Sequence, residues 1–479
     1  MGGGAALDGC LVKVVPLASE DAAVGAPIAD AATPSADGAN ASSDAPSRVV
    51  DASTPIADAG RVPGSDAPAA DGTATGSPGG AGSVDLLVVL DDSASMGFSQ
   101  GYAIGYVGYV VSGLLNQHGV NDVRVGVVTT DLGTPGSTVP GCAVSDGGDG
   151  AMLNPRVRGA ATQTHPGPEI SDAFCTPEVQ AANFVTVRST DDPMQQLWRG
   201  GCPMHVATTG CGLEQQLEAA YRALVTRGGP GGANEGFLRR DATLAILVVS
   251  DEDDGSARDC RYHDGVGACS DALDVYDASS TRWASPDLNL RFYDYTPASA
   301  QDPTWPLERY VDPARPLRGF LGLKPGHPER VVFGALTGVP VAVPQRTDGT
   351  TDWDRVLGPA APGRPDDFVA RDGQAAMTSP TDPSGPTSMR QRDPDPMCPS
   401  RMVPACRQNH TAPTSSCSSG DQYYAWRARR IAEVARRFDE SALCAGGPCR
   451  NGMVASICDS DDVTPAARFA AIIGRRVGP

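Results

Sequence analysis

Two short apolar runs, each leading into an aspartate, constrain the fold of this chain more than any other feature. One run covers residues 84–90 and leads into Asp91, and the other covers 244–250 and leads into Asp251. Short runs rich in Val, Ile and Leu are typical of strands buried on both faces, as in a parallel sheet. In a doubly wound sheet, the carboxyl ends of the strands at the topological switch point meet at one crevice. We therefore expect Asp91 and Asp251 to face each other there.

The rest of the chain alternates between helical and strand patterns, which favours a parallel sheet. Apolar residues at helical spacing indicate the helices, and runs of β-branched residues indicate the strands. The expected elements are helices at 100–117, 212–225 and 312–323, strands at 122–130, 330–336 and 453–457, a helical stripe from Ile431 to Phe438, and a last helix from Thr464. The predicted fold is α/β, with a doubly wound, mostly parallel sheet flanked by helices.

The composition divides the chain into a linker and one domain. Residues 1–82 are predicted to be a disordered acidic linker rich in Ala, Asp, Pro and Ser, because residues 16–82 contain no aromatic side chain and offer little apolar surface to bury. Residues 83–477 are predicted to form the domain. Two stretches within it, at about 132–207 and 340–415, are rich in Gly, Pro, Asp and Thr, and we interpret them as long loop insertions.

The charge balance excludes some partners. The chain has 38 Lys and Arg against 57 Asp and Glu, a formal net charge of −19. This charge repels phosphate backbones, so we expect no nucleic-acid partner. No run reaches the roughly 18 apolar residues that a transmembrane helix needs.

Thirteen cysteines favour an oxidising compartment over the cytosol. None stands in a C-x-x-C pair, so disulfides are a better interpretation than a zinc ribbon. Four pairs have the spacing of a local loop: Cys202 with Cys211, Cys260 with Cys269, Cys398 with Cys406, and Cys444 with Cys449. We therefore expect a secreted or bacterial cell-envelope protein.

Cys10 has a separate interpretation, because Leu7-Asp8-Gly9-Cys10 loosely resembles the cleavage box of a bacterial lipoprotein. Such a signal needs a charged start and an apolar stretch of about 7 to 15 residues, and residues 1–6 provide neither. The alternatives are a lipid anchor at Cys10, with a start annotated too late, and a chance match.

The segment Asp91-Asp92-Ser93-Ala94-Ser95 is the strongest chemical signal in the sequence. Its D-x-S-x-S spacing lets alternate oxygen side chains converge on one small cation from a tight loop. Mg²⁺ prefers oxygen ligands in octahedral geometry and retains several waters, so two hydroxyls with carboxylates from separate loops suit it. Mg²⁺ is the expected ion, with Mn²⁺ or Ca²⁺ as alternatives.

Three segments resemble von Willebrand factor A-type domains, most closely those of bacterial envelope proteins. They are VDLLVVLDDSASM, GCGLEQQLEAAYRAL and ANEGFLRRDATLAILVVSDEDD, and the resemblance covers about 84–131 and 205–256. It implies a metal-ion-dependent adhesion site. In that family two serines and a threonine ligate the ion, aspartates bind it directly or through water, and an acidic group of a protein partner completes the shell.

Carried over by position, the resemblance implies an ion site formed by Asp91, Ser93, Ser95, Thr209 and Asp251. The threonine is the departure from the family pattern, because Cys211 stands where the hydroxyl is expected. Thr209 or Thr208 would then serve from slightly earlier in the chain, or Glu214 would substitute.

The function we expect is that of a cation-dependent, adhesion-type protein-binding module, not an enzyme. G-x-S-x-G, H-E-x-x-H and Walker A patterns are all absent from the sequence. Two alternatives remain: a metal-assisted hydrolase with Asp91 as nucleophile and Asp251 as the second acid, and a structural surface protein with an inert site. Asp253 and Asp254 are expected in a solvated loop, in preference to a second ion site.

Overall fold

The structure is a computed structural model. It describes residues 82–97, 99–134, 139, 148, 150–152, 183–192, 195–196, 204, 206, 208, 210–258, 304–357, 394–395, 398–402, 406–408, 423–426, 428–459 and 461–477. All of them belong to a unit that spans Ala70–Pro479. The predicted linker up to residue 81, with Cys10, lies outside the described residues.

A six-stranded sheet with the order β10-β5-β4-β1-β2-β3 forms the centre of the domain. The strands are β1 (Ser83–Leu90), β2 (Asp122–Thr129), β3 (Phe184–Arg188), β4 (Thr243–Val249), β5 (Val331–Thr337) and β10 (Gly452–Ser456). All neighbours are parallel except β3, which pairs antiparallel with β2. The predicted doubly wound, mostly parallel α/β fold is confirmed.

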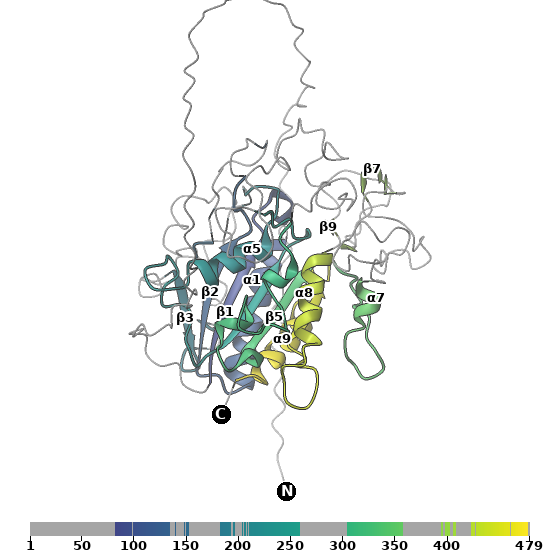
Figure 1. Cartoon of the computed structure of the whole chain (residues 1–479). Coiled ribbons are helices and arrows are strands. Elements are labelled where there is room, and N and C mark those ends of the chain that lie inside the picture. The colour runs from purple at the N-terminus through teal and green to yellow at the C-terminus, as the bar shows by residue number, and fades with distance from the viewer. Residues whose placement is uncertain are drawn as a thin grey trace, which may run out of the picture. The chain divides into compact units, whose positions relative to one another are not determined.

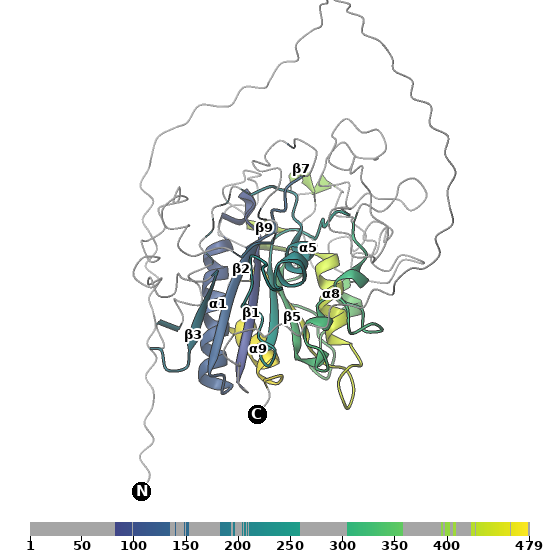
Figure 2. The same cartoon turned by 60° about the vertical axis from the view of Figure 1, so that its left-hand side comes forward.

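Helices cover both faces of this sheet (Figures 1 and 2). On one face, α1 (Ser99–Gln117) packs beside α9 (Val463–Gly474). On the other lie α5 (Gln216–Tyr221), which continues as the π-helical turn η3 (Arg222–Thr226), and α8 (Arg429–Asp439). Because successive side chains of a strand point to opposite faces, each strand contributes residues to the helix-covered layers on both sides of the sheet.

Strand β1 illustrates this alternation. Leu86, Val88 and Leu90 join the apolar cluster under α1 and α9, whereas Leu87 and Val89 join the cluster under α5 and α8. Every residue of β1 is buried. An apolar run without polar alternation therefore corresponds to a central strand covered on both faces.

Shorter elements complete the described residues. They are the 3₁₀ turns η1 (Ala94–Gly97), η6 (Leu307–Arg309), η7 (Leu321–Leu323) and η8 (Pro328–Arg330), the helix α7 (Trp353–Leu357), and the strands β6 (Pro394–Asp395), β7 (Cys398–Met402), β8 (Cys406–Gln408) and β9 (Tyr423–Ala425). Strands β6 and β7 pair with each other, as do β8 and β9.

Parts of both stretches assigned to loop insertions contribute to the core. Strand β3 lies within 132–207 and forms an edge of the sheet, with Val185 and Val187 buried. Helix α7 lies within 340–415, where the fully buried Trp353 donates its ring N–H to Asp439 at 2.8 Å. Both elements are short and lie within stretches rich in polar residues, so their hydrophobic patterns are too brief to distinguish a strand or helix from a loop in the sequence.

The helix predicted at 312–323 is wrong. The chain there forms turns, and Gly319 has a φ of +57°. A Cβ at Gly319 would lie 2.4 Å from the carbonyl oxygen of Tyr310, so the chain folds back tightly on itself at this point. The periodicity of the apolar residues reflects their packing on the core, because Phe320 and Leu321 are both buried.

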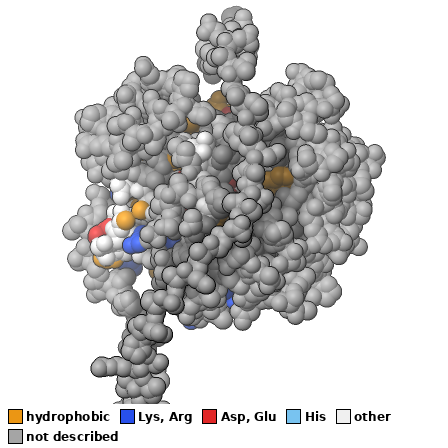
Figure 3. Space-filling model, turned by 90° about the horizontal axis from the view of Figure 1, so that it is seen from above, with side chains coloured by type: hydrophobic (Ala, Val, Ile, Leu, Met, Phe, Trp, Pro, Cys, Tyr) orange, Lys and Arg blue, Asp and Glu red, His pale blue; other side chains and the backbone are white. Residues whose placement is uncertain are grey.

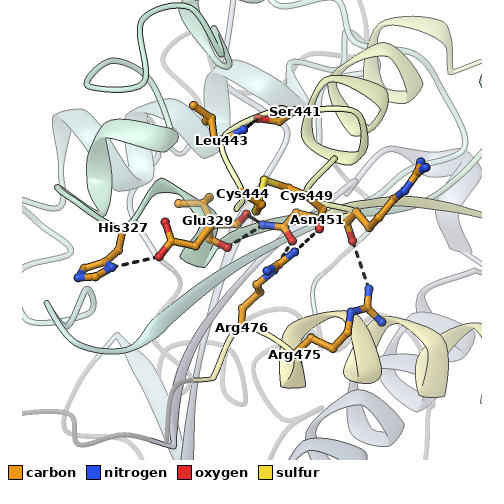
Figure 4. The surroundings of a disulfide bond; sticks show 11 residues. His327, Glu329, Ser441, Leu443, Cys444, Cys449, Asn451, Arg475 and Arg476 are labelled. Atoms are coloured by element: carbon orange, nitrogen blue, oxygen red, sulfur yellow. Dashed lines mark hydrogen bonds and ion pairs between the residues drawn. A yellow bond between two sulfur atoms is a disulfide. The ribbon is translucent and has the colours of Figure 1, made fainter. Parts of the chain in front are cut away.

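The expected disulfide between Cys444 and Cys449 is present and closes the turn between α8 and β10 (Figure 4). Asn451 lies beside it and links two neighbouring segments, donating to the carbonyl oxygen of Glu329 at 2.7 Å and accepting from Arg476 at 2.6 Å. Cys211 and Cys458 are also disulfide-bonded. Among the described residues, no helix has the length and apolar character needed to cross a bilayer.

Candidate metal centre

The candidate site lies where the two central strands end. From β1 the chain proceeds to β2 and β3 on one side, then returns to β4 and continues to β5 and β10 on the other. The switch point is therefore between β1 and β4, as the paired acid-tipped runs predict. Asp91 donates its N–H to the carbonyl oxygen of Val249 at 3.0 Å, and Ser250 donates its hydroxyl to Asp91 Oδ2 at 2.6 Å.

The residues after β1 form a tight loop that turns its oxygens toward Asp251. Asp91 Oδ1 accepts the backbone N–H of Ser93 at 2.9 Å, which closes the turn. The hydroxyls of Ser93 and Ser95 are hydrogen-bonded at 2.9 Å, and Ser95 donates to Asp251 Oδ1 at 3.1 Å. The structure thus brings together four of the five residues carried over from the family resemblance.

The fifth residue, Thr209, lies outside the described residues, but its neighbours contact the loop. Gly210 donates its N–H to the carbonyl oxygen of Asp92 at 2.8 Å. A Cβ at Gly210 would lie 2.4 Å from the carboxyl carbon of Asp92, so any larger residue here would displace the Asp92 side chain. Cys211 donates its N–H to Asp131 at 3.2 Å. Thr208 is half-buried.

Glu214, the third candidate for the missing hydroxyl, is buried at the site. It precedes α5 and is 2 % exposed. Thr130, at the end of β2, donates its hydroxyl to Glu214 Oε2. The other oxygen, Oε1, is buried and receives no hydrogen bond from the described residues. Sequence reasoning offered Glu214 as a substitute ligand because Cys211, three residues earlier, stands where the family resemblance implies a threonine.

Burial strongly perturbs the three carboxyls of Asp91, Glu214 and Asp251. Loss of hydration raises the pKa of Asp91, partly offset by the hydrogen bond from Ser250. It raises the pKa of Glu214 and of Asp251 well above their ordinary values, and repulsion from Asp91 adds to both shifts. In the view from above, a few described side chains are visible, among them acidic, basic and apolar ones (Figure 3).

Among the described residues, none of these three carboxyls has a basic partner of the kind that the buried acids Asp85 and Glu218 have. Asp85 pairs with Arg239 at 2.7 Å, and Glu218 pairs with Arg309 at 2.9 Å. Among the described residues, no salt bridge includes Asp91, Glu214 or Asp251. A buried carboxylate without a counter-charge is costly, so such a group takes up a proton or a cation.

The donor set fits a hard cation. It comprises two serine hydroxyls and three carboxyls, all of them oxygen ligands of the kind Mg²⁺, Mn²⁺ and Ca²⁺ accept. The orphaned oxygen of Glu214 provides an acceptor that a cation would satisfy. In the described part of the chain, no three acidic, histidine or cysteine side chains stand as a ready group of metal ligands, so the hydroxyls are essential to the fit.

Asp253 and Asp254 are not in a solvated loop, and that prediction is wrong. Both are buried, and Asp253 accepts the backbone N–H of Arg430 at 2.9 Å. Asp254 accepts the backbone N–H of Leu217 at 2.9 Å and the side chain of Arg430 at 3.1 Å. The two aspartates therefore hold the first turns of α5 and α8 beside the site. Burial raises the pKa of Asp253 to about 7.

No family model matches this chain, and no curated protein matches it.

Proposed function

We propose that this chain is a divalent-cation-dependent protein-binding module of the kind that von Willebrand factor A-type domains provide. The cation is Mg²⁺, with Mn²⁺ and Ca²⁺ as alternatives. The observation that carries the proposal is the group formed by the buried Asp91, Ser93 and Asp251 with Ser95, whose oxygens are linked across the switch point without a basic side chain among the described residues. A cation would supply the missing positive charge.

In this proposal, Ser93 and Ser95 hold the ion with their hydroxyls, while Asp91 and Asp251 accept from its waters or bind it directly. Asp91 is fixed by Ser250 and by the N–H of Ser93, so its carboxylate is already oriented. Ser95 is exposed, so the ion would be reached from solvent on this side. There an acidic group of a protein partner would complete the coordination shell. Thr209 or Thr208, or Glu214 in their place, would contribute the remaining ligand.

We also propose that the protein is secreted or located in the bacterial cell envelope. The disulfide between Cys444 and Cys449, and the disulfide-bonded state of Cys211 and Cys458, support an oxidising compartment. Lipidation at Cys10 remains an open alternative to a freely secreted form.

Isothermal titration calorimetry tests the binding function. Titration of Mg²⁺ or Mn²⁺ into EDTA-stripped protein should show one binding event, and Asp91→Ala should abolish it. Asp354→Ala is the matched control, because the Asp354 side chain is 80 % exposed and far along the chain from the strand ends. Absence of binding by the wild type would contradict the proposal. Turnover of a phosphoester that Asp91→Asn abolishes would instead support the hydrolase.

A further inference from the structure

Glu214 lies at the proposed ion site and takes no part in the ligand set that the family resemblance implies. Its backbone is fixed by two contacts: Gly255 donates its N–H to the carbonyl oxygen of Glu214 at 2.8 Å, and the next residue, Gln215, donates to the carbonyl of Thr130 at 3.2 Å. These contacts hold Glu214 between the segments that follow β2 and β4, with little freedom to turn to solvent.

The two oxygens of Glu214 have different surroundings. Thr130 satisfies Oε2, and the hydroxyl of Thr130 is itself completely buried. Oε1 is buried without a hydrogen-bond donor among the described residues. Thr130, which holds the other oxygen, also donates its N–H to the carbonyl oxygen of Leu90 at 3.3 Å, so Glu214 lies beside the end of β1, where Asp91 follows. Burial, and in addition repulsion from Asp91, raises the pKa of Glu214. Two carboxylates that face each other are both acceptors. A group that joins them must carry positive charge or supply a proton.

We propose that Glu214 is a third acidic residue of the ion site and replaces the threonine hydroxyl of the second family motif. This inference depends on the proposed function, since it assigns a residue to the same cation. A carboxylate in place of a hydroxyl adds one negative charge, so Glu214 would bring a third acidic residue to the divalent ion, together with the serine hydroxyls without which the acids alone do not form a ligand group among the described residues. Such a site holds its cation more tightly and favours ions of higher charge, because affinity follows the number of charged ligands.

The proposal accounts for Cys211 at the expected threonine position. A disulfide-bonded cysteine cannot provide the hydroxyl, and its N–H is already donated to Asp131. Glu214 lies three residues further along the chain and has the reach and charge to compensate. Its side chain therefore supplies the oxygen that the loop at 208–211 would otherwise lack.

Three variants test this assignment by binding and by coordination number. Glu214→Gln, which keeps an oxygen for Thr130, should weaken Mg²⁺ at least about tenfold in calorimetry. It should weaken Tb³⁺ more than Mg²⁺, because the lost charge matters more for a trivalent ion. In Glu214→Ala, luminescence lifetimes of bound Tb³⁺ in H₂O and D₂O should show more coordinated water than in wild type. Thr209→Ala should weaken Mg²⁺ less than Glu214→Gln does.

Thermal unfolding in EDTA distinguishes an ion-site residue from a merely structural one. Neutralising an uncompensated buried acid should leave the melting temperature of Glu214→Gln equal to or above that of wild type, although its cation affinity falls. If Asp91→Ala abolishes binding while Glu214→Gln binds like wild type, Glu214 is not part of the site and the proposed function stands. If the wild type binds neither Mg²⁺ nor Tb³⁺, both proposals fail.

Discussion

The hydroxyl of Ser250 donates a 2.6 Å hydrogen bond to Oδ2 of Asp91 and so joins the ends of β4 and β1. Ser250 also accepts from the side chain of Gln216 at 2.8 Å, which ties both strands to α5. One buried hydroxyl thus orients the aspartate that begins the candidate site. The two strands are adjacent and parallel, so removal of the Ser250 hydroxyl would affect both the stability of the fold and the geometry of the site.

Replacing Ser250 with alanine should therefore lower both the free energy of unfolding and the affinity for Mg²⁺. Asp91 and Gln216 would each lose a buried hydrogen-bond partner, which predicts a loss of about 1–3 kcal/mol in the free energy of unfolding. The affinity for Mg²⁺ should fall about 10- to 100-fold, because an outer-shell partner of a ligand is removed. Urea denaturation in EDTA and calorimetry measure the two effects. Ser441→Ala is the control, since among the described residues the Ser441 hydroxyl makes a single, 3.4 Å contact, with the N–H of Leu443. An equal loss of Mg²⁺ affinity in Ser441→Ala would contradict the account.

Gly210 and Gly212, on either side of Cys211, provide a matched pair. Gly210→Ala should displace Asp92, because the new Cβ would lie 2.4 Å from its carboxyl carbon, whereas a Cβ at Gly212 meets nothing within 4 Å. We expect Gly210→Ala to lower the melting temperature and weaken Mg²⁺ binding, and Gly212→Ala to change neither. Differential scanning fluorimetry with and without Mg²⁺ makes the comparison. Identical melting temperatures and Mg²⁺ affinities of the two variants would show that the contact between residue 210 and Asp92 does not affect the ion site.

Asp461 makes stability depend on pH at the start of α9. It accepts the backbone N–H groups of Val463 at 3.1 Å and Thr464 at 3.0 Å, and the side chain and backbone of Thr464 lower its pKa from 3.8. Because the folded-state pKa is lowered, this contribution is present above pH 3.8 and is lost as pH falls through the lowered value.

Denaturation of two Asp461 variants checks this. At pH 7, Asp461→Ala should lose about 1 kcal/mol of unfolding free energy, and Asp461→Asn, whose amide oxygen can still accept, should lose less. The difference between wild type and Asp461→Ala should shrink as the pH is lowered below 3.8. A difference that is constant with pH would assign the effect to packing alone.

The central strands and the juxtaposition of the residues that follow them could be predicted from the sequence because their signals are local. The run that ends in Asp91 has no polar alternation and therefore had to be buried on both faces. Asp251 follows a run of the same kind, and parallel strands bring their carboxyl ends to one edge. The spacing of Ser93 and Ser95 then placed the hydroxyls next to the two acids.

The remaining features depend on contacts that no local pattern contains. Asp253 and Asp254 belong to an acidic run typical of solvent, but the N–H group that Asp253 accepts belongs to Arg430, 177 residues away along the chain. Helix α5 begins later than its apolar spacing predicts, because Glu214 and Gln215 make contacts with β2 and the loop after it. The last helix begins at Val463, one residue before Thr464, because Asp461 caps its first turn.

The most direct test of the account is to locate the cation. Crystals of the protein grown with Mn²⁺ and measured near the manganese absorption edge should show one anomalous peak at the carboxyl ends of β1 and β4. The account predicts that this peak lies within coordination distance of Ser93 Oγ and Ser95 Oγ, with the carboxyls of Asp91 and Asp251 around it. A peak elsewhere, or none at a Mn²⁺ concentration that saturates binding in solution, would contradict the account.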